Sequence, residues 1–325
     1  MKSVICPAYG PPSVLELIDL PDPIPGPGEV VVRIKAAGIN YPDLICVSGT
    51  YPIPSAPPFI PGIEGAGVVF SIGIGVTRFD VGDRVCWQNN VVKSAFSEAI
   101  SLPETCLCKV PDGVDLTVAS CIPTAFGTAA FALKHRAQLK SGETVVIHGA
   151  TGGVGQAAIQ IAIAHGARVI ATGGSADKLS QLRALGAYET VLADDNMQTR
   201  ILELTGGRRA DVVLDTVGGD LFDASISLLA PYGRLLVVGF TSGEFGTARS
   251  NILLIKAISV IGVNYGHFLV TEPSAASREI EFILYQVAVG RLRPSVEVLE
   301  GLESVPESLR RLEARSVIGK LAIRV

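Results

Sequence analysis

The apolar and polar positions of the chain follow two different patterns, which change near residue 119. From there on, short runs rich in Val, Ile and Leu alternate with helical stretches of about 10 residues that end at or near glycine. The expected strands cover residues 144–149, 167–173, 189–194, 210–217, 234–240 and 256–264. Strands that are apolar on both faces and joined by helices are typical of a parallel sheet covered on both sides. The pattern therefore predicts an α/β fold with a doubly wound parallel sheet of six strands.

Residues 1–118 instead show short β-type runs separated by turn signals such as PDPIPGPGE at 21–29, which predict a mostly antiparallel β domain. After Asn264 the alternation of strands and helices ends. The tail is expected to form a helix near 274–290, a run at 295–301, a second helix near 304–314 and a strand at 320–325. This tail holds too few residues for a core of its own, so we expect it to complete the first domain.

The segment VVIHGATGGVG at 145–155 joins a β-type run to a helical stretch through a glycine-rich turn. In a dinucleotide-binding fold, Gly152 allows the backbone to approach a pyrophosphate and Gly155 allows the helix to pack on the strand. The usual first glycine of this motif is replaced by Ala150. A tight turn without a ligand is the alternative, which the βαβ repeat that follows disfavours. We therefore expect phosphates to bind at this helix N-terminus.

The second expected strand ends at Gly173, where cofactors with a free ribose 2′-hydroxyl usually meet an acidic residue. Ser175 and Lys178 follow instead, and they are suited to bind a 2′-phosphate, which favours NADPH over NADH. The alternative roles are a helix N-cap for Ser175 and a solvated lysine for Lys178. The loop after the fifth strand is expected to flank the nicotinamide ribose, unless it is an ordinary connection. Its residues are Gly239, Phe240 and Thr241.

The overall composition narrows the class of protein. A chain of 325 residues with 48% hydrophobic and 18% charged residues suggests two domains with large cores. A net charge of -4 disfavours binding to nucleic acids or anionic membranes. The six cysteines lack C-x-x-C spacing, which is typical of buried thiols in a reducing compartment. We expect neither a signal peptide nor a membrane span, and we therefore expect a cytoplasmic protein.

Several blocks of the sequence, taken together, resemble the medium-chain dehydrogenase/reductase superfamily and, more closely, its zinc-independent quinone oxidoreductase branch. The blocks are AAGINYPDLICVSGTYP at 36–52, PFIPGIEGAGVV at 58–69, TAFGTAAFAL at 124–133 and ATGGVG at 150–155. The resemblance implies a GroES-like catalytic domain of residues 1–118 and 266–325, split around a Rossmann cofactor-binding domain of residues 119–265. It also implies a homodimer that pairs through the last Rossmann strand, near residues 258–264. We further expect cofactor contacts from Thr128, Gly153, Val154 and Asn264.

The zinc ligands of the zinc-dependent relatives can be compared with the residues at the same positions of this chain. The three positions that hold their catalytic zinc carry Asn40, Ile63 and Thr124 here. None of these side chains is a thiolate or an imidazole, so we expect no zinc. Without a metal, the site suits hydride addition to a quinone or an α,β-unsaturated carbonyl, because conjugation delocalises the charge that develops.

Two residues are candidates to assist this chemistry. The resemblance places Asn40 toward the nicotinamide, where its amide can hydrogen-bond a carbonyl oxygen, although an asparagine can equally hold a loop. Tyr51 resembles a substrate-facing tyrosine and can donate a proton or form a wall of the pocket. Tyr41 is a weaker candidate of the same kind, and Glu64 is expected to order the site by hydrogen bonds. The four histidines are taken as structural, and Arg234, Lys256 and Lys320 as mostly solvated charges.

The sequence thus predicts a zinc-independent NADPH-dependent reductase of small quinones or enones. One alternative is an enoyl thioester reductase, which needs a basic surface for a carrier phosphate that the sequence does not clearly provide. Another is an NADPH-binding protein with little catalysis. RNA binding is disfavoured by the acidic charge balance.

Overall fold

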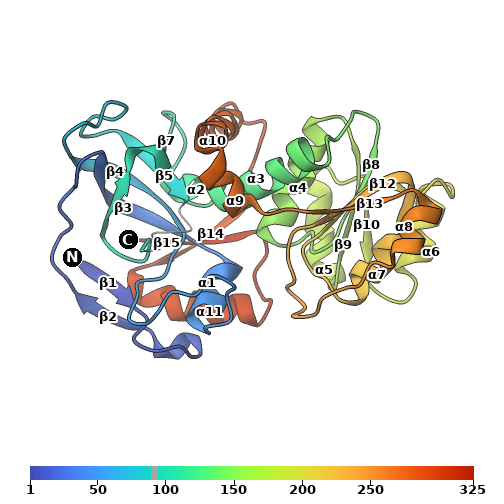
Figure 1. The fold of residues 1–325 in the computed structure, drawn as a ribbon, viewed down its shortest axis with the longest axis horizontal. Coiled ribbons are helices and arrows are strands. Elements are labelled where there is room, and N and C mark those ends of the chain that lie inside the picture. Colours follow the sequence, from blue (N-terminus) through green and yellow to red (C-terminus); the bar gives the residue numbers. More distant parts are fainter. Residues whose placement is uncertain (89–93) are drawn as a thin grey trace. The chain divides into compact units, whose positions relative to one another are not determined.

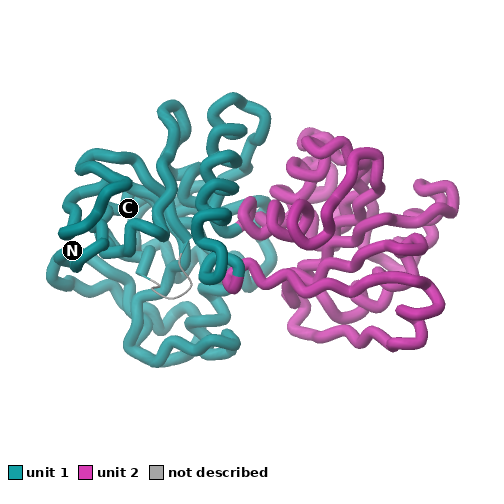
Figure 2. The backbone as a smooth tube through the Cα atoms, turned by 45° about the horizontal axis from the view of Figure 1, so that its top comes forward, with its two compact units in different colours: residues 1–124, 268–325 teal, residues 125–267 magenta. Residues whose placement is uncertain are grey.

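A computed structural model describes residues 1–88 and 94–325, and these divide into two compact units (Figures 1 and 2). Unit 1 comprises residues 1–124 and 268–325, and unit 2 comprises residues 125–267. Both boundaries fall slightly later in the chain than the expected 118/119 and 265/266. Among the described residues, no helix combines the length and the apolar character that crossing a membrane requires.

Unit 1 is built on a seven-stranded sheet in which only the β14–β15 pair is parallel. The strands are β3 (Glu29–Ile39), β4 (Glu64–Ile72), β5 (Arg84–Gln88), β6 (Ala99–Pro103), β7 (Leu107–Lys109), β14 (Val296–Glu300) and β15 (Lys320–Arg324). The order is β14-β15-β3-β4-β5-β7, and β6 pairs with β3. A two-stranded ribbon joins β1 (Lys2–Ile5) to β2 (Glu16–Asp19). The tail therefore returns to unit 1, because β15 pairs with β3, so the expectation for it is confirmed.

The helices of unit 1 are α1 (Tyr41–Val47), α2 (Leu116–Ala119), α10 (Pro273–Ala288) and α11 (Val305–Glu313), with 3-10 turns at Pro12–Val14, Glu104–Cys106 and Leu302–Ser304. The helix α1 lies where the sequence pattern predicted only β structure. It forms because Asn40 and Asp43 make a capping box and Pro42 occupies its first turn. Its apolar residues Leu44 and Val47 join the core of the unit beside Trp87.

Unit 2 contains the predicted parallel sheet of six strands. These are β8 (Thr144–Ile147), β9 (Arg168–Gly173), β10 (Glu189–Leu192), β11 (Ala210–Asp215), β12 (Leu229–Val237) and β13 (Ser259–Gly262). The order is β10-β9-β8-β11-β12-β13, and every pair is parallel, which confirms the doubly wound dinucleotide-binding fold. The last strand is shorter than predicted, because Lys256 still belongs to a helix.

The helices of unit 2 cover both faces of this sheet (Figure 1). They are α3 (Ile122–Ala130, shared with unit 1), its π-helical continuation Phe131–Arg136, α4 (Gly153–Ala164), α5 (Ala176–Ser180) with the 3-10 turn Gln181–Leu185, α6 (Met197–Leu204), α7 (Asp220–Leu228) and α8 (Ser250–Lys256). A further helix, α9 (Tyr265–Thr271), begins in unit 2 and ends in unit 1. Helices α4 and α5 pack beside β9, whereas α7 packs on β11 and β12. All six cysteines carry thiols rather than disulfides, and all but Cys106 are buried.

The core of unit 2 contains one fully buried histidine, His148, at the end of β8. Its Nδ1 lies 2.6 Å from Thr172 Oγ1 and its Nε2 lies 3.0 Å from Ser225 Oγ. The Ser225 hydroxyl already donates to the Leu221 carbonyl, so Nε2 must carry the ring proton and Nδ1 must accept from Thr172. This neutral tautomer satisfies both ring nitrogens, and burial lowers the pKa of His148 to about 4.

The buried histidine predicts a pH-dependent stability. Below pH 6.5, His148 is protonated in the unfolded chain but stays neutral in the folded protein down to about pH 4. The free energy of unfolding therefore falls as the pH falls through this window. Between these two pH values, we expect the free energy of unfolding to decrease by roughly 3 kcal/mol more in the wild type than in His148→Gln. Urea unfolding measures this difference. His165→Gln, which changes a half-buried histidine at the end of α4, serves as the control. Parallel pH profiles for wild type and His148→Gln would contradict the assignment.

Candidate functional site

The glycine-rich turn between β8 and α4 has the geometry of a phosphate-binding turn. Gly149 adopts a left-handed conformation with φ of +66°, so it supplies the tight turn one residue before Ala150. A side chain at Gly155 would overlap the backbone of Gly149 and Ala150, which explains why this position requires glycine. At Gly152 an added Cβ would meet only the Gly149 carbonyl oxygen, at 3.5 Å. Space is therefore left for a ligand at the N-terminus of the helix.

Within the described part of the chain, the same turn presents polar groups without protein partners. Gly152 is the N-cap of α4 and offers no side chain to the first N–H groups of the helix, which include those of Gly153 and Val154. The buried Gln156 Oε1 has no hydrogen-bond partner among the described residues. The N–H groups of this helix N-terminus fit an anionic ligand such as a pyrophosphate, as the motif predicted, whereas Gln156 Oε1 can only accept a hydrogen bond.

At the end of β9, the chain passes from Gly173 through Gly174 to the short helix α5. No atom lies within 4 Å of a Cβ built at Gly174, so this backbone is open to approach. Ser175 caps α5, and its hydroxyl oxygen accepts the Lys178 N–H at 3.4 Å. The first acidic residue after the strand is Asp177, inside the helix. The strand end itself therefore carries no carboxylate, and the N-cap role considered for Ser175 is confirmed.

The remaining predicted cofactor residues of unit 2 lie mostly beyond the later strands. Gly239, Phe240 and Thr241 follow β12, and the Thr241 N–H donates to the Thr216 carbonyl at 3.2 Å. Asn264 follows β13 and its Oδ1 accepts the His267 N–H at 2.9 Å, which ties it to the start of α9. Because the strands are parallel, these residues share the carboxyl edge of the sheet with the glycine-rich turn and Ser175. Thr128 lies apart from them, half-buried in α3.

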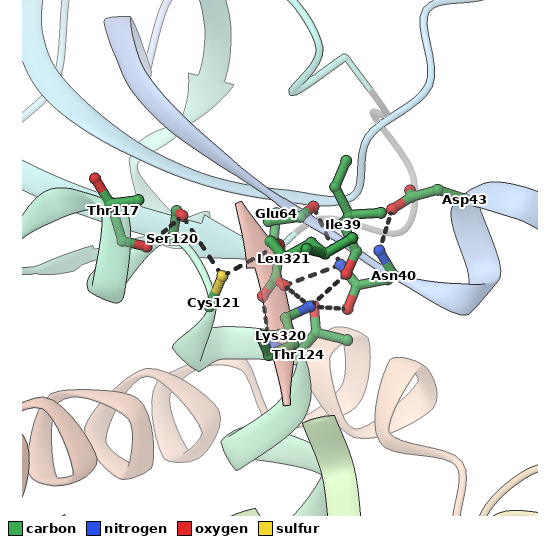
Figure 3. Close-up of polar contacts among 11 residues, drawn as sticks. Ile39, Asn40, Asp43, Glu64, Thr117, Ser120, Cys121, Thr124, Lys320 and Leu321 are labelled. Atoms are coloured by element: carbon green, nitrogen blue, oxygen red, sulfur yellow. Dashed lines mark hydrogen bonds and ion pairs between the residues drawn. The ribbon is translucent and has the colours of Figure 1, made fainter. Parts of the chain in front are cut away.

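Unit 1 contains a buried cluster of polar side chains, which we name the Lys320 cluster (Figure 3). Its members are Asn40, Asp43, Glu64, Thr124 and Lys320, and each is at most 8% exposed. They come from α1 and the residue before it, β4, the start of α3, and β15. Four segments that are distant in the sequence thus meet at one charged centre.

Lys320 and Glu64 form a buried ion pair with a separation of 2.8 Å. The Lys320 ammonium also donates to the Ile39 carbonyl at 2.7 Å and to Asn40 Oδ1 at 2.6 Å. Burial alone lowers the pKa of Lys320, but the Glu64 carboxylate outweighs it, so this pKa lies above its usual value. Glu64 Oε1 accepts from Asn40 Nδ2 at 2.9 Å and Oε2 accepts the Thr124 N–H at 2.8 Å. Glu64 orders the cluster by hydrogen bonds, as expected.

Asp43 is the second carboxyl group of the cluster. Its Oδ2 accepts the Asn40 N–H at 2.8 Å, whereas its buried Oδ1 has no hydrogen-bond partner in the described part of the chain. Burial raises the pKa of Asp43 to about 7, against the opposing effects of the Asn40 N–H and the Lys320 charge. Asp43 therefore changes charge near neutral pH, next to Asn40.

Tyr51 lies beyond α1, where the backbone N–H groups of Thr50 and Tyr51 both donate to the Ile45 carbonyl. Burial raises the pKa of Tyr51, with further contributions from Cys46 and Asp43. Its hydroxyl therefore keeps its proton at neutral pH and can act as a hydrogen-bond donor. Tyr41 is the first residue of α1 and packs against the core of the unit, which gives it a structural contact.

The positions that hold zinc in the zinc-dependent relatives do not fit that metal here. Asn40 is held by Lys320 and Glu64, Ile63 is a buried hydrocarbon, and Thr124 Oγ1 is a neutral hydroxyl. No group of three His, Cys, Asp or Glu side chains in the described residues could hold a metal ion. In addition, the Lys320 ammonium disfavours a second cation beside Asn40.

The sequence did not reveal Lys320 or Asp43 as site residues. The prediction that Lys320 is solvated is wrong, because 7% of it is exposed and all three of its N–H bonds find partners. Arg234 is also not a free charge, since it makes two hydrogen bonds of 2.8 Å to Glu143. Lys256 donates to the Ile226 carbonyl at 2.6 Å. Only the position of Lys320 at the start of an apolar strand hinted at burial.

Comparison with known proteins places these features in a family. The family model of the alcohol dehydrogenase GroES-like domain matches residues 26–114, and that of the zinc-binding dehydrogenases matches residues 153–283. A quinone oxidoreductase from Pseudomonas aeruginosa is 40% identical over 271 residues, which are 83% of this chain and 80% of that protein.

Solved structures agree over the whole chain. A crystal structure of a Pseudomonas syringae quinone oxidoreductase is 34% identical, with a TM-score of 0.90 over 100% of this chain and 99% of that one. The Escherichia coli quinone oxidoreductase, solved in complex with NADPH, is 27% identical, with a TM-score of 0.92 over 100% of both chains. With its GroES-like and Rossmann units, this chain therefore belongs to the medium-chain dehydrogenase/reductase family of oxidoreductases, in its quinone oxidoreductase branch.

Proposed function

We propose that this protein is an NADPH-dependent reductase that transfers a hydride to a small quinone or α,β-unsaturated carbonyl without a metal. The observation that supports the proposal is that this chain has both of the following features. Unit 2 has an open glycine-rich turn and a strand end that bears Ser175 and Lys178 in place of an acid. Unit 1 has a polar cluster, centred on Lys320, whose residues do not fit zinc.

The cofactor contacts follow from the chemistry of each group. The N–H groups of Gly153 and Val154 bind the pyrophosphate at the N-terminus of α4. The Ser175 hydroxyl and the Lys178 ammonium bind the 2′-phosphate by hydrogen bond and charge. When bound, NADPH supplies a hydride, which carries two electrons. The NADPH complex of the Escherichia coli relative supports this choice of cofactor.

The acceptor needs one proton in addition to the hydride. A quinone that receives both becomes a hydroquinone, and an enone becomes a saturated ketone. The Tyr51 hydroxyl donates a hydrogen bond to the oxygen on which charge develops, since its raised pKa keeps it protonated. The proton itself comes from Tyr51 or from water. Conjugation in the acceptor takes the place of the Lewis acid that zinc provides in other dehydrogenases.

We also propose that the protein is a homodimer that pairs through β13, the outer strand of the sheet in unit 2. An outer strand has unpaired backbone groups, and the neighbouring helix α8 exposes Leu254 and Ile255 at 81% and 76%. Both features favour pairing with a second copy of the strand. Sedimentation equilibrium is expected to give twice the chain mass of 34.0 kDa, and a monomer at micromolar concentration would rule out this pairing.

The activity itself is tested with a panel of small quinones and enones. We expect the purified protein to oxidise NADPH in a manner that depends on the acceptor, without added metal and in the presence of a chelator. The absorbance of NADPH at its nicotinamide band follows the reaction. Tight NADPH binding without turnover on any acceptor would favour a cofactor-binding protein instead, and loss of activity with the chelator would refute the metal-free mechanism.

The choice between NADPH and NADH is tested at Lys178. We expect Lys178→Ala to raise the KM for NADPH by about tenfold, because a charge-assisted contact with the 2′-phosphate is lost, and to leave the KM for NADH unchanged. Lys140→Ala serves as the control, because Lys140 is an exposed lysine that precedes β8 at the opposite edge of the same sheet. Equal effects of Lys178→Ala on both cofactors would remove the proposed role.

A further inference from the structure

A pocket of about 480 Å³ opens at the amino edge of the parallel sheet in unit 2. It is lined by the turn 140–143, which leads into β8, and by Arg208, Arg209 and Asp211 around the start of β11. These two segments lie side by side because β8 and β11 are neighbouring parallel strands. The glycine-rich turn follows the carboxyl end of β8, so the pocket is separate from the turn that fits a pyrophosphate.

The two carboxylates of the pocket are both held by protein groups. Each oxygen of Glu143 accepts a hydrogen bond of 2.8 Å from Arg234. These hydrogen bonds hold the pKa of Glu143 below its usual value, and the nearby Lys140 charge makes a smaller contribution. Asp211 Oδ2 accepts the Thr144 N–H at 2.7 Å. Glu143 therefore has its counter-charge within the protein, and Asp211 is anchored to the backbone.

Arg208 and Arg209 bring two positive charges to the same pocket. Within residues 1–88 and 94–325, neither guanidinium group forms an ion pair with a carboxylate. Arg209 Nη1 donates to the Ser227 carbonyl at 2.6 Å, which leaves most of its five N–H bonds available, and Arg208 is exposed. Guanidinium groups bind phosphate oxygens through pairs of parallel hydrogen bonds. The pocket therefore has donors and charge suited to a phosphate group.

A third cation lies beside Arg209 and increases the excess of positive charge. Lys256 Nζ donates to the Ile226 carbonyl at 2.6 Å and to the Ser227 carbonyl at 3.3 Å, and Arg209 contacts the same Ser227 oxygen. Burial and, after it, the Arg209 charge lower the pKa of Lys256. Like charges at this separation repel each other, and an anion bound to Arg209 offsets that repulsion.

The backbone of Arg209 is better suited to glycine than to arginine. Its φ is +71°, in the left-handed region that is unfavourable for a residue with a side chain. The Arg209 N–H donates to Thr205 Oγ1 at 3.1 Å, which helps to hold this conformation. Unfavourable backbone conformations of this kind are concentrated at functional sites. The chain thus keeps a guanidinium group at the pocket at a cost that glycine would avoid.

We propose that this pocket binds a phosphate dianion through Arg208 and Arg209, supplied either as inorganic phosphate or as the phosphate group of a small phosphorylated molecule. A volume of about 480 Å³ lies within the range of pockets that hold small organic ligands. The inference does not rest on the proposed function, because no residue of the pocket takes part in hydride transfer. Since the pocket and the glycine-rich turn lie at opposite edges of the sheet, phosphate and NADPH bind at the same time.

The first test is calorimetric titration of the wild-type protein saturated with NADPH, so that the cofactor site is occupied. The probes are inorganic phosphate and glycerol 3-phosphate, and NaCl of equal ionic strength is titrated separately. We expect one phosphate group to bind per chain. Tighter binding of glycerol 3-phosphate identifies an organic phosphate as the ligand, and tighter or equal binding of inorganic phosphate identifies the free ion. No saturable binding of either probe below about 10 mM, or equal heats with NaCl, overturns the inference.

The second test removes the guanidinium group at its strained position. Arg209→Gly is expected to weaken phosphate binding by about tenfold or more, because charge-assisted hydrogen bonds are lost. Glycine accepts a φ of +71° without steric cost, so the variant is expected to fold, and thermal unfolding checks this. Arg208→Gln, at an exposed position, is expected to weaken binding by a similar factor.

The matched control is Arg315→Gly, which makes the same change in charge at an exposed arginine of unit 1 that is also left-handed, with a φ of +52°. This variant is expected to bind phosphate as the wild type does. If Arg315→Gly weakens binding as much as Arg209→Gly does, the effect comes from the overall charge and the site is refuted. Wild-type affinity in Arg209→Gly refutes it as well.

Discussion

The ion pair between Lys320 and Glu64 is the interaction on which unit 1 depends. Its two residues are 256 positions apart in the chain. The pair connects β15, the last strand along the chain, to β4, which lies on the other side of β3 in the sheet. Loss of one partner from a buried pair leaves an uncompensated charge, which costs about 3–5 kcal/mol. The pair also determines the geometry around Asn40, so the stability of this unit and the shape of its polar centre have the same origin.

The two units show different relations between sequence and function. In unit 2 the backbone forms the site: a turn with a left-handed Gly149, a helix N-terminus without a side-chain cap, and strand ends that share one edge. In unit 1 the side chains form the site, and they are held by charge and hydrogen bonds within a β core. A backbone site tolerates many side chains around it, whereas the cluster in unit 1 depends on the identity of each member.

This difference explains how much could be predicted from the sequence. The six parallel strands and the glycine-rich turn were predicted, because periodicity and local glycines determine both. The role of Ser175 as an N-cap was also visible, since capping is local. Lys320 and Asp43 were missed, because their burial follows from the pairing of β15 with β3 and from the packing of α1. The helix α1 was missed for a related reason: its capping box is short and follows a strongly β-type run.

The discontinuity of unit 1 has a consequence for how the protein is made. Unit 2 is one continuous segment, 125–267, so it can fold as soon as it has left the ribosome. Unit 1 must wait, because its strand β3 pairs with β15, which is synthesised near the end of the segment 268–325. Until then Glu64 has no Lys320 to neutralise it. A chain that stalls before residue 320 therefore carries a complete nucleotide-binding fold beside an unfinished partner, and it is a natural target for proteolysis.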